Sequence, residues 1–140
     1  MIKFNIIARE FSTELGQTIF TQFKEESLLV KGIDGIPKPP QAFVIEIDNK
    51  IIATIVIHIF WGQLHIKYLV VDKQYRNQGL GTLLMNHALD FGKNNQCQFA
   101  YLETLDFQAP NFYEKLGFKT ELIREGFSQN TTYFYMKKFI

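Results

Sequence analysis

The sequence predicts an α/β (α+β) fold, a mixed β-sheet with helices on both of its faces. Runs of β-branched and aromatic residues, which are typical of strands, alternate with stretches whose apolar residues recur at helical spacing. Their expected order is strand, helix, three strands, helix, strand, helix and strand, without internal repeats or a linker-like segment. Because the chain has 140 residues, a single domain over residues 1–140 is expected.

The first half of the chain predicts a strand, a helix, a loop and a hairpin. Lys3–Ile7 has the composition of a short strand, and apolar residues at helical spacing predict a helix over Thr13–Val30. Two glycines and three prolines in Lys31–Gln41 predict a loop. The β-branched runs Phe43–Ile47 and Ile51–Phe60 then predict two strands joined by a short turn.

The second half predicts three more strands separated by helices. The strands are expected at Gly62–Val71, Phe99–Thr104 and Tyr133–Phe139. A short helix is expected over Ala109–Leu116, and a longer one begins near Leu80. The apolar stripe of the longer helix is predicted to consist of Leu80, Leu83, Leu84, Ala88 and Phe91.

Composition argues against several classes of function. Apolar residues make up 46% of the chain and the net charge is +1, so nothing general points to nucleic acid or to an anionic membrane. Cys97 is the only cysteine, which excludes an intrachain disulfide and favours a reducing, cytoplasmic compartment. The histidines show no ligand spacing, so no metal is expected, and no apolar run reaches membrane-spanning length.

The stretch "VVDKQYRNQGLGTLLM" places Gly79 and Gly81 where the longer helix should begin. The N–H groups at a helix N-terminus are unpaired and attract anions, and glycines there leave room for a bulky one. Arg76 would add a positive charge, and Thr82 would add a hydroxyl in the first turn. The alternative is a turn whose glycines only let the helix and strand pack closely. This stretch alone supports both interpretations.

Two motifs together narrow the choice. The pattern R-x-x-G-x-G at Arg76–Gly81 follows a strand ending in "LVVD", and "APNFYEKLGF" occupies Ala109–Phe118. In this order and at this separation they resemble the GNAT acetyltransferase superfamily. The resemblance implies a mostly antiparallel central sheet of about six to seven strands, with helices on both faces. It also implies that the central strands splay apart around acetyl-CoA.

The resemblance further implies an acetyl-CoA site. Main-chain groups of Leu69, Val70 and Val71, at the end of the central strand, would hold the pantetheine arm. Asn111 is a further candidate contact. The diphosphate would be bound by the loop residues Arg76, Asn77, Gln78, Gly79, Leu80, Gly81 and Thr82.

Acetyl transfer also needs groups that move protons. Tyr113 matches the family tyrosine near the thioester sulfur, where a phenol can protonate the departing thiolate. The alternative for Tyr113 is a side chain that is buried only for packing. For the base we favour Glu103, with His65 and Glu46 as alternatives, and water acting without any base also stays open.

Two positions depart from the pattern of the family. Lys67 stands where many members carry a glutamate that acts as the base. Asp106 stands where many carry an asparagine, and its carboxylate is expected to cap the following helix instead.

The expected reaction moves an acetyl group from acetyl-CoA to a primary amine of a small molecule or peptide. In the family the first helix and the loop after it shape the acceptor site, which here means about Phe11–Gln41. The acceptor is not identified by these residues, and a homodimer is left open. The alternative function is a catalytically silent acetyl-CoA sensor or interaction module.

Overall fold

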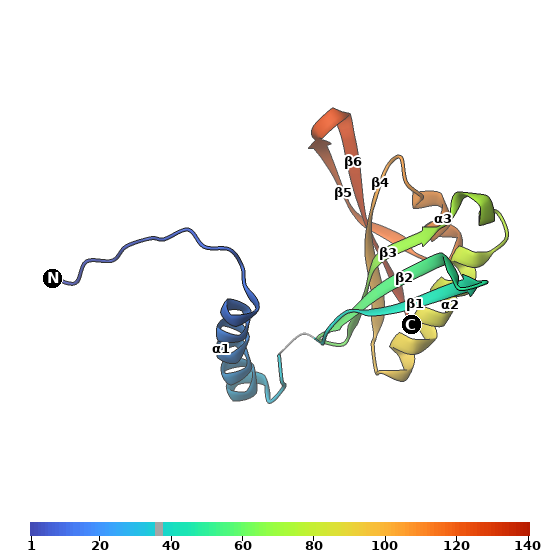
Figure 1. Cartoon of the computed structure of the whole chain (residues 1–140). Coiled ribbons are helices and arrows are strands. Elements are labelled where there is room, and N and C mark those ends of the chain that lie inside the picture. Colours follow the sequence, from blue (N-terminus) through green and yellow to red (C-terminus); the bar gives the residue numbers. More distant parts are fainter. Residues whose placement is uncertain (36–37) are drawn as a thin grey trace. The chain divides into compact units, whose positions relative to one another are not determined.

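The computed structural model describes residues 1–35 and 38–140. The chain divides into two compact units, one on either side of this break. Figure 1 labels the helices and strands of both units. The expectation of a single domain over residues 1–140 stays a prediction. No helix among the described residues is long and apolar enough to cross a membrane.

The first unit contains one helix, α1, which spans Thr13–Lys31. Ser12 Oγ accepts a hydrogen bond of 3.1 Å from Leu15 N–H at its start, and Gly32 ends it at a left-handed φ of 68°. The helix confirms the prediction to within one residue. The predicted strand Lys3–Ile7 is wrong, because residues 1–12 form no helix or strand and no described strand pairs with them. A strand needs such a partner for its backbone groups.

The predicted loop over Lys31–Gln41 includes Ile36 and Pro37, which lie outside the described residues. The expectation that Phe11–Gln41 shapes the acceptor site therefore also reaches beyond them, and it stays a prediction.

The second unit is built on a six-stranded sheet with the strand order β1-β2-β3-β4-β6-β5. Neighbouring strands run antiparallel except β3 and β4, which are parallel. This mixed, mostly antiparallel sheet confirms the predicted fold class. The strands are β1 Gln41–Ile47, β2 Lys50–Phe60, β3 Gln63–Val71, β4 Phe99–Leu105, β5 Lys119–Phe127 and β6 Thr131–Phe139.

Helix α2, Leu80–Asn94, covers one face of this sheet and closes the core (Figure 1). Leu83 is 59% exposed, so the predicted apolar stripe is offset from the true one. Gly92 lets the helix approach β3, because a Cβ there would lie 2.8 Å from Leu64. The buried residues of α2 are Leu84, Met85, Ala88, Leu89 and Gly92. The predicted helix layer on the other face involves α1, which lies in the first unit, and stays a prediction.

The edge strand β5 was missed by the sequence prediction. All of Lys119–Phe127 is exposed, so its residues show no alternation of buried and exposed positions. Its pairing with β6 places it at the edge of the sheet.

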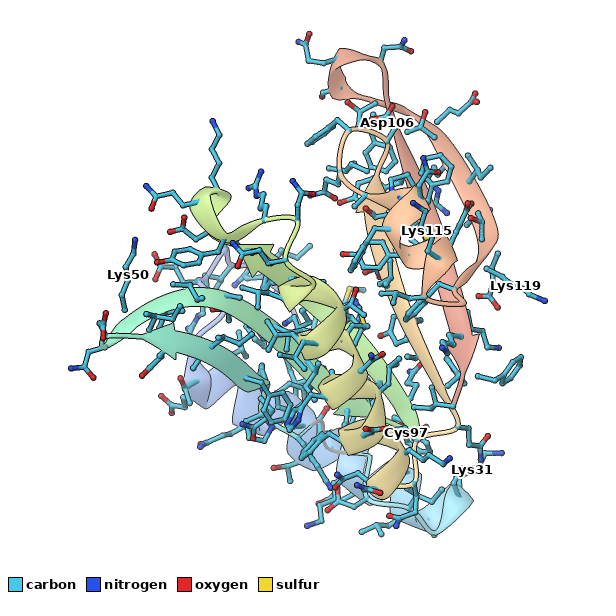
Figure 2. All side chains as sticks on the ribbon, turned by 90° about the vertical axis from the view of Figure 1, so that its right-hand side faces the viewer. Lys31, Lys50, Cys97, Asp106, Lys115 and Lys119 are labelled. Carbon is cyan, nitrogen blue, oxygen red and sulfur yellow. The ribbon has the colours of Figure 1, made fainter. Side chains whose placement is uncertain are left out.

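Strands β3 and β4 pair at one end only. Their ladder joins Gln63 to Phe99, Leu64 to Ala100 and His65 to Tyr101, and both strands continue beyond it. A β-bulge lies just past the ladder, because Ile66 and Tyr68 pair with adjacent residues of β2 and leave Lys67 unpaired. Figure 2 shows the two strands, green and orange, close together at the end near Cys97 and apart at the other. The parallel pair therefore has a closed end and an open end.

Candidate functional site

A cavity of about 970 Å³ lies at the open end of the β3–β4 pair. The open ends of both strands, the loop that leads into α2 and the region around α3, Pro110–Lys115, line it. From the predicted site residues it brings together Leu69, Val70, Val71, Arg76, Asn77, Gly79, Leu80, Gly81, Thr82, Glu103 and Tyr113. Gln78 and Asn111 are exposed and lie outside this lining.

The two glycines at the start of α2 act in different ways. Gly79 has a φ of 78°, a left-handed conformation that side chains rarely adopt, and open space surrounds the position of a Cβ there. A Cβ at Gly81 would lie 3.3 Å from the ring of Phe112, so Gly81 lets the helix pack closely against α3. Close packing therefore explains Gly81, whereas backbone conformation and access explain Gly79.

The first turn of α2 presents free N–H groups to the cavity. No side chain among the described residues caps the helix at Gly79, and Leu83 is the first residue whose N–H bonds back, to Gly79 O at 2.9 Å. The N–H groups of Leu80, Gly81 and Thr82 precede that bond. Together with the positive end of the helix dipole they form an anion-binding surface.

Arg76 and Asp72 shape the loop before the helix. Arg76 Nε donates a hydrogen bond of 3.1 Å to Val71 O, which holds the guanidinium at the mouth of the cavity and leaves its other N–H groups available. The pKa of Asp72 is held below its usual value, chiefly because Gln74 N–H donates to Oδ1 at 3.0 Å. Lys50 Nζ, 3.4 Å from Asp72 Oδ2, acts in the same direction.

Tyr113 reaches the cavity from α3. Its ring packs edge to face against Phe112 and Phe118, with ring centroids 5.2 and 6.1 Å apart. Burial raises the pKa of the phenol, because the charged phenolate would be desolvated. The side chain therefore keeps its proton throughout the neutral range, as a proton donor must.

Of the candidate bases, Glu103 alone lines the cavity. Its Oε2 lies 2.7 Å from Nε2 of His65, which belongs to the closed end of the strand pair and is not part of the lining. Tyr101 stacks on the imidazole. Burial, and next the Glu103 carboxylate, raise the pKa of Tyr101. Glu46 lies on β1 and is also outside the lining.

The two departures from the family pattern differ in their surroundings. Lys67 lines the cavity at the β-bulge. Asp106 does not cap α3, so that prediction is wrong: the helix follows Ala109, which makes no side-chain hydrogen bond within the described part of the chain. Instead Asp106 Oδ2 accepts a hydrogen bond of 3.2 Å from Thr132 N–H, so it joins the end of β4 to β6 (Figure 2).

Sequence reasoning missed a group of residues that complete the cavity wall. Gln108 turns the chain between β4 and α3, because its Oε1 accepts a hydrogen bond of 2.9 Å from Leu105 N–H. A usable signal was present for several of them: Tyr75 directly precedes the glycine motif, and Ala109 and Phe112 belong to the tyrosine motif. The missed lining residues are Ile66, Tyr68, Tyr75, Leu102, Phe107, Gln108, Ala109 and Phe112.

Within residues 1–35 and 38–140, no group of three or more His, Cys, Asp or Glu side chains is placed so that it could hold a metal ion. Cys97 is buried at the end of α2 opposite the cavity, and burial raises the pKa of its thiol. A thiol in such surroundings is a weak nucleophile.

Comparison with known proteins identifies the family. The model of the acetyltransferase (GNAT) family matches residues 4–118. The chain belongs to the GNAT acetyltransferase family. This confirms the resemblance drawn from the glycine loop and the tyrosine motif.

Similar proteins carry acetyltransferase names. Streptothricin acetyltransferase A of Bacillus subtilis is 32% identical over 102 residues, which are 71% of this chain and 58% of that protein. Blasticidin-S acetyltransferase of Streptomyces morookaense is 39% identical over 67 residues, 44% of this chain and 46% of that one. The chain thus spans about half the length of the curated relatives it matches.

Solved structures agree with the GNAT fold. An acetyltransferase from Bacillus cereus matches with a TM-score of 0.77 at 22% identity, covering 96% of this chain and 98% of that one. A Bacillus anthracis structure, described as a putative streptothricin acetyltransferase in complex with acetyl coenzyme A, matches with a TM-score of 0.66. Its identity is 27%, and the match covers 74% of this chain and 64% of that chain.

Proposed function

We propose that this GNAT protein transfers an acetyl group from acetyl-CoA to a primary amine of a small molecule or peptide. One observation carries the proposal. A single cavity joins the anion-binding start of α2, the open backbone edge of β3, the carboxylate of Glu103 and the partly buried phenol of Tyr113. These are the groups that binding a diphosphate thioester and transferring its acyl group require.

Acetyl-CoA would bind along the open end of the strand pair. The N–H groups of Leu80, Gly81 and Thr82, with Arg76, would bind the diphosphate. The β3–β4 ladder ends at His65, so β4 does not pair with Leu69–Val71, although Val71 O accepts a hydrogen bond from Arg76 Nε. Main-chain groups there would orient the pantetheine arm and its thioester carbonyl.

The reaction itself would divide between two side chains. Glu103 takes a proton from the acceptor ammonium, and the neutral amine attacks the thioester carbonyl. The nitrogen of the tetrahedral intermediate then loses its second proton to water, the carbon–sulfur bond breaks, and Tyr113 gives its proton to the departing thiolate of CoA. Water returns a proton to Tyr113 and removes one from Glu103.

An amine panel tests the proposal. Acetyl-CoA consumption and acetylated product are measured with streptothricin, blasticidin S and peptides that carry a free α-amino group, because relatives are named for such substrates. We expect turnover with at least one class, at a rate that rises with pH as the acceptor loses its proton. CoA binding is measured in parallel by calorimetry. Absence of CoA binding would remove the proposal altogether.

A catalytically silent acetyl-CoA sensor is the second candidate. Lys67 favours the sensor, because this lysine lines the cavity at the position where many GNAT enzymes carry the glutamate that acts as the base. A sensor would bind acetyl-CoA stoichiometrically and release no product with any amine across the pH range. The same calorimetric and product measurements therefore separate the two functions.

A further inference from the structure

A hydrogen bond connects the closed end of the β3–β4 pair to the cavity. His65 is in the last residue pair of the ladder, opposite Tyr101, and it does not line the cavity. Glu103 lies two residues beyond Tyr101 on β4 and does line it. His65 Nε2 and Glu103 Oε2 are 2.7 Å apart, the short distance of a hydrogen bond to a charged group.

The chemistry of the two groups decides which of them donates the hydrogen bond. An ionised carboxylate only accepts hydrogen bonds, so His65 Nε2 carries the hydrogen and donates it to Glu103 Oε2. One carboxylate oxygen is then occupied by the imidazole. The other, Oε1, can accept a hydrogen bond from the ammonium group of an acceptor.

The imidazole is itself held in place. Its ring stacks on Tyr101 with centroids 4.4 Å apart and an angle of 4° between the planes. The His65 side chain is 19% exposed, compared with 33% for Glu103. Because rotation of the ring would lose both the stacking and the hydrogen bond, His65 restricts the rotamers of the glutamate.

Two neighbouring titratable side chains, Lys137 and His58, have other partners within the described chain. Lys137 Nζ lies 3.6 Å from Glu121 Oε1 and over the ring of Phe99. His58 pairs with His65 across the strands and stacks on Phe60. Lys67 lines the same cavity as Glu103, but within the described residues the side-chain hydrogen bond of the Glu103 carboxylate is to His65.

We propose that His65 is a positioning residue for acetyl transfer. It holds the Glu103 carboxylate at the cavity in the orientation that takes the proton of the acceptor amine. The inference rests on the proposed function, in which Glu103 is the group that receives that proton. Holding a reacting group in one geometry raises the rate without any contact to the substrate.

Two substitutions separate positioning from packing. His65→Gln can place an amide N–H near the position of Nε2, whereas His65→Phe keeps a ring on Tyr101 and lacks the donor. We expect His65→Phe to lower kcat/KM for the amine about tenfold or more, the effect of one hydrogen bond to a charged group. His65→Gln should retain most of the activity, and the Kd for acetyl-CoA should not change in either variant.

Stability should follow the opposite order. His65→Phe keeps the stacking and should resist urea at least as well as His65→Gln. Should activity instead follow stability, with the phenylalanine variant the more active, His65 has only a packing role and the proposal is overturned. In a Glu103→Gln background His65→Phe should have little further effect, because the group that it positions is no longer a carboxylate. A full additional tenfold loss would also overturn the proposal.

A measurement that needs no acceptor amine separates the positioning role of His65 from the proposed acetyltransferase function. Long-range ¹H–¹⁵N spectra report which imidazole nitrogen carries the hydrogen, and His58 and His87 serve as internal controls. We expect Nε2–H in His65 and a change at His65 alone in Glu103→Gln. Turnover that is insensitive to His65 overturns only this inference. Absence of turnover with the Nε2–H pairing intact overturns the proposed function and, with it, the positioning role.

Discussion

The two ends of the β3–β4 pair differ in what fills the space between the strands. At the closed end backbone hydrogen bonds join the strands, and Leu64 and Ala100 are fully buried beneath α2. At the open end a β-bulge in the β2–β3 pairing leaves Lys67 without a partner on β2, and Leu69–Val71 and Glu103 line a cavity of about 970 Å³. One end thus serves stability and the other leaves backbone groups available for a ligand.

This difference shows how a sheet can hold a site without losing its core. Separating two strands leaves unpaired N–H and C=O groups, which cost free energy unless water or a ligand satisfies them. The closed end compensates by packing α2 tightly at Gly92. Changes at the closed end should therefore affect folding, and changes at the open end should affect binding and turnover.

The largest expected effect is on stability. Leu64→Ala at the closed end should lower the free energy of unfolding by about 3 kcal/mol, because it leaves a cavity in a fully buried site. Leu69→Ala, half-buried at the open end, is the matched control and should cost about 1 kcal/mol. Urea denaturation measures both. Equal losses would contradict the division between the two ends.

The second largest expected effect is the loss of kcat on substitution of Tyr113. Tyr113→Phe should lower kcat about a hundredfold, since it removes the proton donor, and should leave the Kd for acetyl-CoA unchanged. Tyr101→Phe is the control, because Tyr101 also has a raised pKa but lies at the closed end and keeps its ring stacking as phenylalanine. An unchanged kcat in Tyr113→Phe would return Tyr113 to a packing role.

The pKa of Tyr113 adds a pH test to this prediction. A phenol loses its proton as pH rises through its pKa, and burial raises that pKa above the ordinary value of about 10. The alkaline fall in rate that depends on Tyr113 should therefore lie at higher pH than the titration of an ordinary tyrosine. A fall at lower pH that disappears in Tyr113→Phe would contradict the observed burial.

An effect on binding should be smaller. Gly79→Glu should weaken CoA binding about tenfold or more, because a carboxylate there repels the diphosphate at the start of α2. Gly62→Glu is a close control, since Gly62 has a φ of 74°, also faces open space and belongs to the β2–β3 turn at the closed end. Both variants carry similar backbone strain. Equal affinity for CoA in the two would remove the diphosphate assignment.

The smallest expected effect concerns Asp72 at the open end. Its folded pKa lies below the ordinary value of 3.8, so its contribution to stability is present above the unfolded pKa and is lost as pH falls through the folded one. Asp72→Asn keeps an oxygen for Gln74 N–H but removes the charge. The urea midpoint of this variant should be slightly lower at neutral pH and should converge with wild type in strong acid. A constant difference at all pH values would contradict the assignment.

Helices and the glycine loop were predictable because their signals are local. Ser12 and Gly32 lie where α1 begins and ends, and the strand before Asp72 leads into the α2 loop as expected. The loop and the tyrosine motif also allowed most of the cavity lining to be named in advance. Strand β5 could not be found in this way, since an exposed edge strand is defined by its pairing with β6.

The two wrong predictions, for Asp106 and for Lys3–Ile7, depend on hydrogen-bonding partners that are distant in the sequence. Asp106 was predicted to cap α3 because it shortly precedes that helix, but it accepts a hydrogen bond from Thr132, 26 residues away. Lys3–Ile7 has the composition of a strand and pairs with none of the described strands. Local composition states which conformations a segment tolerates, and the available hydrogen-bonding partners decide among them.

By itself the sequence determined the positions of the glycines, the ends of the helices and the membership of the GNAT family. Only the tertiary structure decided that His65 and Glu103, 38 residues apart, share a hydrogen bond. The parallel register of β3 and β4 brings them together, and the bulge at Lys67 lies directly beyond the end of this ladder. The hydrophobic pattern of a strand decides which face it buries, but the residues opposite each other also depend on how two separate strands pack against one helix.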